Sequence, residues 1–367
     1  MQNPGKERRE TENYEKYWKV TLAFTDIDSK KFLGTLKVIK TFIDDNWNAL
    51  HKEYSKKLYE ELQEKVNEFN PMMETSIRKS INQFVKLGFV NSGGKGYHHN
   101  LEDFLNAKTN DKRKILFSRI VYERSNFQSS WTRKDPKQGH IKFLIKTLEK
   151  IKTLCKQDIL ALMRVDIENI EKGYLSRQEL DQFVEETEDM NFIDRKYNQL
   201  SHFHSILTRL DDLTFVTRYP HGECLHFQEY ADEQFPERWK HEGREPYLQG
   251  RYRSLLEQES KEKLGSVQCM VSGKTTTCIA SHMKPFSRST KDEAYDENNG
   301  LYLSAEIDSH FDKGRISFND DGTIIFRNDF PEDQKKGFKD LCINPVFLNK
   351  KRREYLDFHR KSVMGNK

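Results

Sequence analysis

The N-terminal two thirds of the chain has apolar residues at helical spacing. Between residues 18 and 66 they recur three or four positions apart, as at Phe32 and Leu36, and residues 141–163 repeat the pattern with lysines between the apolar positions. Apolar side chains with this period lie on one face of a helix. The pattern therefore predicts a mostly helical N-terminal region, with a break in the second stretch near Lys156.

Residues 70–105 combine a helical pattern with a turn. Asn70-Pro71 breaks the chain, and the apolar stripe that begins at Ile77 ends before Gly88. The glycine-rich sequence 91–96 then predicts the tip of a hairpin. A helix followed by a strand and a basic hairpin is the layout of a winged helix, whose helix fits the major groove of DNA. The alternative is an ordinary amphipathic helix followed by a β-hairpin.

The polar face of this predicted helix and the hairpin tip carry side chains of the types that contact phosphates and base edges. They are Arg78, Lys79, Asn82, Gln83, Lys86 and Lys95. If the unit is a winged helix, we expect these residues to bind DNA.

A second helix-and-hairpin pattern lies at about residues 195–230. An apolar helical stripe ends near Leu210, residues 213–218 have the composition of a strand, and residues 224–227 return after a turn at 219–222. The pattern predicts another winged-helix-like unit. It precedes a stretch rich in charges and turn formers, which is typical of a linker.

That linker spans residues 228–246, and we therefore divide the chain into residues 1–246 and residues 247–367. The first region is expected to be mostly helical, with winged-helix-like units that recognise DNA. The second opens with a charged helix and continues into short strands. The fold class that follows is a multidomain α+β protein.

Composition adds less than the local patterns do. Charged residues make up 33% of the chain and hydrophobic residues 35%, but the 24 Phe, 15 Tyr and 4 Trp argue against disorder. The formal net charge of +4 is weak evidence for a polyanionic partner. There is no signal-peptide pattern and no apolar run of membrane-spanning length. We expect a cytoplasmic protein without a membrane partner.

The five cysteines are scattered and form no CxxC pair. A structural zinc site therefore has little support. Buried free thiols in a reducing compartment are the state that we expect.

Residues 278–318 hold the strongest chemical pattern in the chain. His282 ends an apolar and β-branched run, Asn299 follows seventeen residues later before Gly300, and Asp308 comes nine residues after Asn299 in a helical pattern. A positioned imidazole, a kinked loop and an oxygen ligand on a following helix are the parts needed to hydrolyse a phosphodiester with one metal ion.

This segment resembles the HNH, or ββα-metal, finger of nucleases, and the closest likeness is to the HNH domains of type II restriction endonucleases. The resemblance covers about residues 247–363. It implies a β-hairpin packed on a helix with one divalent ion between them, flanked by further helices. It also implies that His282 is the general base and that Asn299 holds the loop and orients His282. A lone structural histidine is the alternative for His282, and Asn298 is the alternative register for the asparagine.

The same resemblance implies that Asp308 is a metal ligand, and Ser281 stands where many relatives have a second one. A carboxylate favours Mg²⁺ or Mn²⁺ over zinc because hard ions prefer oxygen. A serine hydroxyl is a poor ligand, so we expect weak affinity for free metal. A helical surface aspartate is the alternative for Asp308. His310 has the wrong register for a ligand, since it lies two residues beyond Asp308 on the predicted helix.

Further basic residues flank the finger. Arg251 and Arg253 belong to a segment that resembles the helix preceding the finger in this family, and we expect them to contact DNA. The basic run at residues 350–353 is another candidate for phosphate contacts, with a solvated helix face as the alternative.

These features predict a metal-dependent DNA endonuclease of the restriction type. Residues 1–246 would recognise a sequence in double-stranded DNA, and the finger would cut beside it, as type IIS enzymes do. Because one finger cuts one strand, a double-strand break would need a transient homodimer or two successive events. A modification-dependent or other defence nuclease is the alternative among enzymes. A winged-helix DNA-binding regulator with an inactive finger is the alternative from another class.

Overall fold

The computed structural model describes residues 17–52, 54–133, 138–188, 192–218, 222–227 and 245–365. The chain forms two compact units, Met1–Gln234 (unit 1) and Phe235–Lys367 (unit 2). Most of the predicted turn at 219–222 and of the predicted linker at 228–246 lies outside the described residues.

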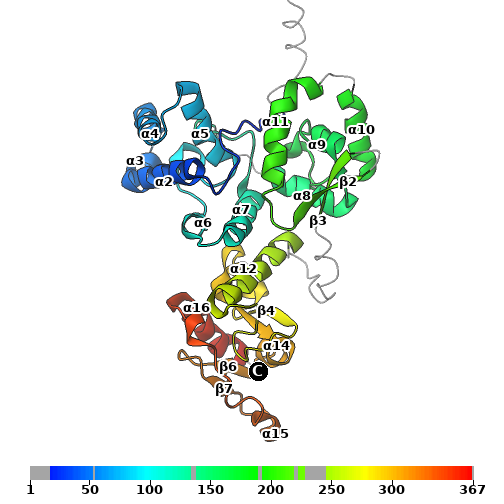
Figure 1. Cartoon of the computed structure of the whole chain (residues 1–367). Helices are drawn as coiled ribbons and strands as arrows, with labels where there is room; N and C mark the ends of the chain where they lie inside the picture. The colour runs from blue at the N-terminus through cyan, green and yellow to red at the C-terminus, as the bar shows by residue number, and fades with distance from the viewer. Residues whose placement is uncertain are drawn as a thin grey trace, which may run out of the picture. The chain divides into compact units, whose positions relative to one another are not determined.

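The first part of unit 1 is helical (Figure 1). Ser29 and Ser55 begin two of its helices, since each side-chain oxygen accepts a hydrogen bond from a backbone N–H three residues on. Its helices are α2 (Lys30–Asp45), α3 (Trp47–Lys52), α4 (Lys56–Phe69), α5 (Glu74–Lys86), α6 (Leu101–Asn106) and α7 (Asn110–Arg124). Buried rings form the core between them, among them Phe32, Phe84, Phe89, Phe104 and Phe117.

The hairpin predicted after α5 is short. Val90 and Tyr97 form a single antiparallel bridge, and a 3₁₀ turn at Ser92–Gly94 lies between them. The helix of this unit agrees with its apolar stripe, because Ile77, Ile81 and Phe84 are buried.

The polar face of α5 is partly covered by the chain segment that precedes α2. Gln83 is fully buried, and its Oε1 accepts hydrogen bonds from the backbone N–H groups of Ala23 and Phe24 at 2.7 and 2.9 Å. Lys86 is also buried and donates to the backbone oxygen of Lys19 at 2.8 Å. The positions of Gln83 and Lys86 do not support the prediction that they contact DNA, because these hydrogen bonds hold both side chains inside unit 1.

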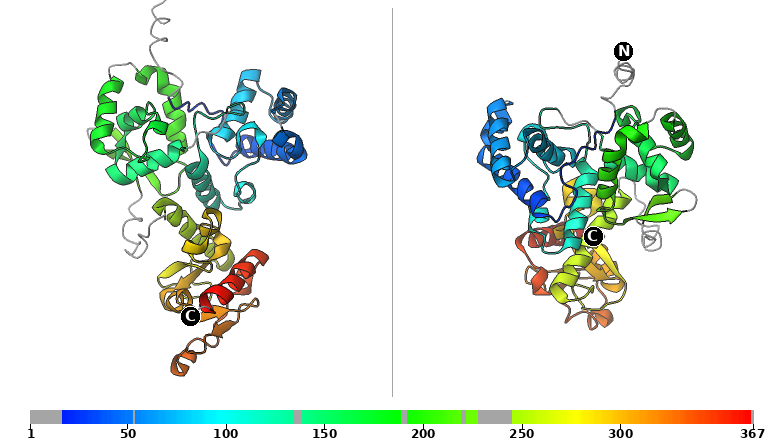
Figure 2. Two further views of the ribbon diagram at one scale, coloured as in Figure 1. Left: turned by 180° about the vertical axis from the view of Figure 1, so that it is seen from behind. Right: turned by 45° about the horizontal axis from the view of Figure 1, so that its top comes forward.

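The second part of unit 1 joins helices to a small sheet. In chain order it comprises α8 (His140–Ile151), β1 (Leu154–Cys155), α9 (Lys156–Leu162), α10 (Arg177–Glu188), α11 (Phe192–Leu207), β2 (Leu213–Arg218) and β3 (Gly222–Phe227). The strands are antiparallel, with β3 in the middle and β1 and β2 at the edges. Figure 2 shows β2 and β3 beside these helices. The break in residues 141–163 falls at Lys152, whose φ of 72° ends α8.

A disulfide joins β1 to β3. Cys155 and Cys224 are direct partners in the sheet, with their Cα atoms 4.0 Å apart, and are covalently linked. The expectation of free thiols is therefore wrong for this pair, because two residues 69 positions apart in sequence become cross-strand neighbours. Cys269, Cys278 and Cys342 are free.

Unit 2 contains a hairpin between two helices (Figure 1). Strands β4 (Cys278–His282) and β5 (Gly300–Ser304) pair antiparallel. Helix α14 (Ala305–Asp312) packs against both strands, and helix α12 (Pro246–Leu264) also contacts both. A second hairpin, a short helix and the C-terminal helices follow, at β6 (Ile316–Phe318), β7 (Ile324–Phe326), α15 (Glu332–Lys335), α16 (Lys350–Phe358) and a π-helical turn at His359–Met364.

The prediction of a mostly helical α+β protein is confirmed. Within the residues that the structure describes, no helix is both long enough and apolar enough to span a membrane.

Candidate functional site

The β4–β5 hairpin places His282 at its loop end, where residues 283–299 join the two strands. The β4 sequence Cys-Ile-Ala-Ser-His pairs with Gly-Leu-Tyr-Leu-Ser of β5, so that His282 lies opposite Gly300 and Ser281 opposite Leu301. His282 is therefore the last residue of β4 and Ser281 the residue before it, next to the loop that joins the two strands.

A backbone carbonyl sets the tautomer of His282. Its Nε2 lies 2.8 Å from the carbonyl oxygen of Ala294, which can only accept a hydrogen bond. The neutral ring must therefore carry its proton on Nε2 and its lone pair on Nδ1. The ring is half-buried and stacks on Tyr252 of α12, with ring centres 4.5 Å apart and an interplanar angle of 16°.

Asn299 is fully buried and holds the loop between the two strands. Its Oδ1 accepts from the backbone N–H of Lys284 at 2.7 Å, and its Nδ2 donates to the carbonyl oxygens of Lys284 and Glu293, each at 3.0 Å. Glu293 immediately precedes Ala294, which bonds His282. One amide thus fixes the part of the loop that orients the imidazole.

Two buried oxygen groups lie on β4 and α14, which pack on each other. Asp308 is in the first turn of α14 and only 7% exposed, while Ser281 is 3% exposed and its Oγ has no hydrogen-bond partner. A buried hydroxyl without a partner and a buried carboxylate are chemically suited to a hard divalent cation such as Mg²⁺. Mg²⁺ commonly uses one or two carboxylates together with water and substrate phosphate. The residues present therefore fit such an ion.

His310 has different surroundings. Its ring packs against Phe330 and Phe338, with ring centres 5.1 Å away in both cases. Burial lowers the pKa of His310, so the ring stays neutral. These contacts give His310 a packing role.

The flanking arginines are engaged inside unit 2. Arg251 is 3% exposed and lies over the ring of Tyr247. Arg253 is half-buried, pairs with Glu257 at 2.7 Å and also contacts Tyr302. The prediction that these two arginines contact DNA is not supported by their positions, because both side chains pack within the unit.

The basic run at 350–353 is divided between the surface and the interior. Arg352 is fully buried, and its guanidinium forms two hydrogen bonds with the carboxylate of Glu259, at 3.1 and 2.8 Å. Lys351 pairs with Asp296, and Arg353 donates to the backbone oxygen of Asp320. Arg352 therefore serves to connect α16 to α12 and cannot contact phosphate.

In unit 1, Arg78 and Lys95 are exposed and Lys79 is half-buried. Asn82 accepts a hydrogen bond from the backbone N–H of Trp131 at 2.7 Å. Three of the six predicted DNA contacts thus keep their side chains at the surface without a bond to the backbone of another segment.

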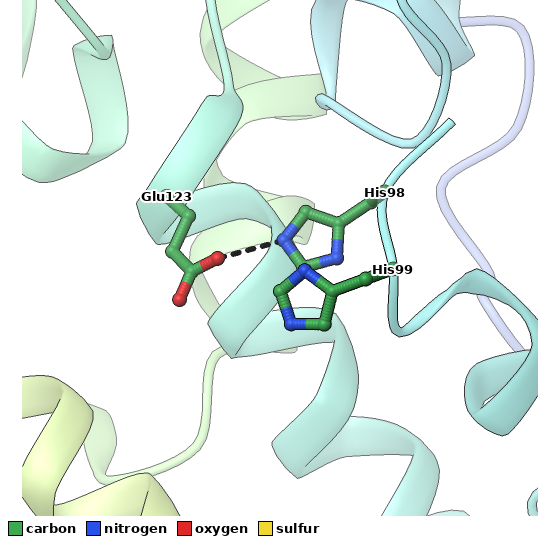
Figure 3. A group of neighbouring side chains, drawn as sticks. All are labelled: His98, His99 and Glu123. Atoms are coloured by element: carbon green, nitrogen blue, oxygen red, sulfur yellow. Dashed lines mark hydrogen bonds and ion pairs between the residues drawn. The ribbon is translucent and has the colours of Figure 1, made fainter. Parts of the chain in front are cut away.

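A second group of potential metal ligands lies in unit 1. Within the described ranges, His98, His99 and Glu123 are the one set of three whose ligand atoms lie within 4.8 Å of one another (Figure 3). The backbone N–H of Asn100 donates to Nδ1 of His98, and Nε2 of His98 bonds Glu123 at 2.8 Å. Arg119 contacts both Glu123 and His99.

These hydrogen bonds argue against a metal ion there. Burial lowers the pKa of His98, and a neutral imidazole has one N–H and one lone pair. The Asn100 N–H uses the lone pair on Nδ1, so Nε2 carries the proton and faces Glu123. Binding a cation at Nε2 would break both of these hydrogen bonds of His98. It would also place the cation near the positive charge of Arg119. We assign this group a structural role.

Sequence reasoning missed Tyr252 and the carbonyl of Ala294. Tyr252 is the aromatic residue between Arg251 and Arg253, so its place in the helix before the finger was a usable signal. A backbone carbonyl gives no signal in the side-chain pattern, and only the folded loop brings it to His282.

One comparison with known proteins identifies part of unit 2. Residues 269–319 match a family model described as HNH endonuclease. The matched segment contains β4, the loop held by Asn299, β5 and α14. No curated protein matches the chain. Unit 2 therefore contains an HNH endonuclease domain, which indicates nuclease activity on DNA with a divalent metal.

Proposed function

We propose that the chain is a metal-dependent endonuclease of the restriction type, in which unit 1 recognises double-stranded DNA and unit 2 hydrolyses it. The observation that carries this proposal is the state of His282. The Ala294 carbonyl holds the proton on Nε2, and the lone pair is then on Nδ1 of a half-buried ring. A neutral imidazole held in one tautomer is what a general base for hydrolysis needs.

In the proposed reaction, Nδ1 of His282 takes a proton from a water molecule, and the water oxygen attacks phosphorus. A phosphorus–oxygen bond forms, the bond from phosphorus to the deoxyribose oxygen breaks, and that leaving oxygen takes up a proton from solvent water. The imidazolium that results keeps its Nε2–H bond to Ala294 O. Asn299 does not react, and its role is to keep the loop backbone in place.

Asp308 would hold the divalent cation, with Ser281 as a weak neutral ligand. Such an ion supplies charge stabilisation to the phosphate and to the leaving oxygen. Since Asp308 belongs to no described group of three His, Cys, Asp or Glu ligands, water and the substrate phosphate would complete the coordination. We expect Mg²⁺ or Mn²⁺ rather than zinc.

The second part of unit 1 supports a winged-helix recognition unit. A helix, a short strand, further helices and a terminal hairpin follow in the order α8, β1, α9, α10, α11, β2, β3, and the sheet order β1–β3–β2 places the first strand beside the last. Helix α11 would enter the major groove. For the first helix-and-hairpin unit, Arg78, Lys79 and Lys95 would contact phosphates.

A type II, type IIS-like enzyme is the form of restriction enzyme that we propose. Its support is the division of the chain into two compact units, one of which contains the HNH domain. Cleavage beside the recognised sequence would follow from this separation. A transient homodimer would cut both strands.

Cleavage of DNA by the purified full-length chain tests the proposal. Phage DNA and a supercoiled plasmid would be incubated with Mg²⁺ or Mn²⁺ and with a chelator. We expect discrete fragments that require the metal. His282→Ala and Asp308→Ala should each lower the cleavage rate at least about 100-fold, because each removes a group needed for the chemical step.

His310→Gln is the matched control, since it changes a histidine on the same helix that packs against rings. It should retain most of the activity. DNA binding without cleavage, unchanged by His282→Ala, would instead identify a DNA-binding regulator. Cleavage of methylated DNA alone would identify a modification-dependent nuclease.

A further inference from the structure

The ring of Tyr252 forms the surface on which His282 lies. Tyr252 is 1% exposed and comes from α12, outside the segment 269–319 that matches the HNH model. The two rings are nearly parallel, 4.5 Å apart at their centres. Tyr252 and the Ala294 carbonyl thus restrain His282 in two ways, by contact with the ring face and by a hydrogen bond at Nε2.

The hydroxyl of Tyr252 also ties together the ends of the two strands. It lies 3.3 Å from the backbone oxygens of Ser281 and Asn299, one on each side of the hairpin. A hydroxyl can donate only one proton, so it shares this proton between the two carbonyls. The backbone that carries His282 and the backbone that carries Asn299 are thereby held at one fixed position.

Gly300 makes room for this contact. A Cβ atom at Gly300 would lie 2.4 Å from the Tyr252 hydroxyl and 2.7 Å from a methyl carbon of Leu256, closer than any real contact. The φ of Gly300 is −121°, so the backbone conformation does not require glycine there. The glycine after Asn299 is needed because α12 packs directly on the hairpin.

From these contacts we propose that Tyr252 is a positioning residue for His282, and that α12 is therefore a necessary part of the nuclease site. This inference rests on the proposed function of His282. It adds that the segment matching the HNH model does not by itself supply the ring on which His282 stacks. Displacing a reacting group by about 1 Å can reduce a rate about 100-fold, so the loss of this ring has a measurable consequence.

The test compares Tyr252→Leu, Tyr252→Phe and the wild-type chain. Leu removes the ring, and we expect kcat for plasmid cleavage with Mg²⁺ to fall about 100-fold while KM for DNA stays within about twofold. Phe keeps the ring but loses the hydroxyl, and kcat should fall about 10-fold, in line with the loss of an outer orienting contact. Tyr302→Phe is the matched control, because its hydroxyl on β5 bonds Glu257 rather than the backbone beside His282.

A spectroscopic readout separates this inference from the proposed function. In ¹H–¹³C NMR spectra of the wild-type chain, the ring protons of His282 should be shifted upfield by the stacked tyrosine, and Tyr252→Phe should keep this shift. Absence of the shift in the wild-type chain overturns the inference, even if no variant folds. Unchanged kcat in a folded Tyr252→Leu chain overturns it as well. A wild-type chain that shows the shift but cuts no DNA would overturn the proposed function while leaving the stacking intact.

Discussion

At the scale of single residues, identical side chains take opposite roles in this chain. Arg352 and Arg353 are adjacent in the sequence, yet Arg352 is fully buried and Arg353 is exposed. Lys86 likewise looked like a surface residue on a polar helix face, but its ammonium group donates to the backbone of residue 19. A polar pattern predicts which face of a helix is hydrophilic, and it does not predict whether another segment will cover that face.

Arg352→Met should destabilise unit 2 by about 3–5 kcal/mol, because it leaves the buried carboxylate of Glu259 without its main partner. Urea unfolding of the full chain, with pulse proteolysis and mass spectrometry of fragments from unit 2, measures this loss. Arg353→Met is the control and should change stability by less than about 0.5 kcal/mol. The double variant Arg352→Met with Glu259→Met should recover a large part of the stability, since no unpaired charge remains. Equal losses for the two single arginine variants would contradict the prediction.

At the scale of elements, side chains from the C-terminal segment hold the HNH domain together. His359 is 1% exposed and stacks on Phe311 of α14 at 3.8 Å. Its Nε2 donates to the carbonyl oxygen of Phe311 at 3.1 Å, and its Nδ1 accepts from the hydroxyl of Ser317 on β6 at 2.9 Å. This one ring therefore connects α14, β6 and the C-terminal turn in its neutral form.

Acidification should weaken these connections. Burial lowers the pKa of His359 to about 4, whereas an exposed histidine in the unfolded chain has a pKa of about 6.5. Below pH 6.5 the unfolded chain binds a proton that the folded chain does not, so stability falls as the pH drops towards 4. Between pH 7 and pH 5 the loss from this residue should be about 2 kcal/mol.

Pulse proteolysis in urea at pH 7 and pH 5 measures that slope for unit 2. His359→Gln removes the titrating ring, so the variant should be less stable at pH 7 but should lose less stability on acidification. The same slope in the variant and in the wild-type chain would show that another group causes the effect.

Some elements followed directly from the pattern of apolar residues. Helix α5 and the helix at 140–151 lie where the stripes predicted them. The turn after α5 was also predicted, but its hairpin is only one bridge long, since the strand composition of a few residues does not determine how far a ladder extends. Strand β1 has two residues and was not predicted, because it exists only through its pairing with β3.

At the scale of the whole molecule, the two units contain different cysteine chemistry. The disulfide Cys155–Cys224 lies in unit 1, and the three free cysteines lie in unit 2. Closing a loop of 69 residues stabilises a folded unit by about 4 kcal/mol in the chain-entropy estimate. Reduction should therefore lower the stability of unit 1 and leave unit 2 unchanged.

Tryptophan fluorescence during urea unfolding, with and without a phosphine reductant, tests this for unit 1 through the buried Trp18 and Trp131. Proteolysis of unit 2 fragments in the same samples is the internal control. Alkylation of the denatured chain without reductant should label three of the five cysteines. Labelling of all five would contradict the disulfide.

The sequence by itself was enough to predict the HNH domain. The order and spacing of His282, Asn299 and Asp308 are local properties of one short stretch, and they predicted an HNH domain that the family comparison confirms for residues 269–319. Residues this close along the chain form a hairpin and a following helix through local hydrogen bonds and turns. Such a motif can therefore be found without knowledge of the rest of the fold.

Only the tertiary structure decided which groups complete that motif and which basic residues remain at the surface. Tyr252 stacks on His282 from a helix thirty residues earlier in the chain, Arg352 is buried against Glu259, and Lys86 is covered by the segment before α2. Each of these contacts joins residues far apart in sequence, and their burial depends on how whole elements pack. Packing between distant elements leaves no periodic pattern in a single sequence, and for this reason these roles required the folded structure.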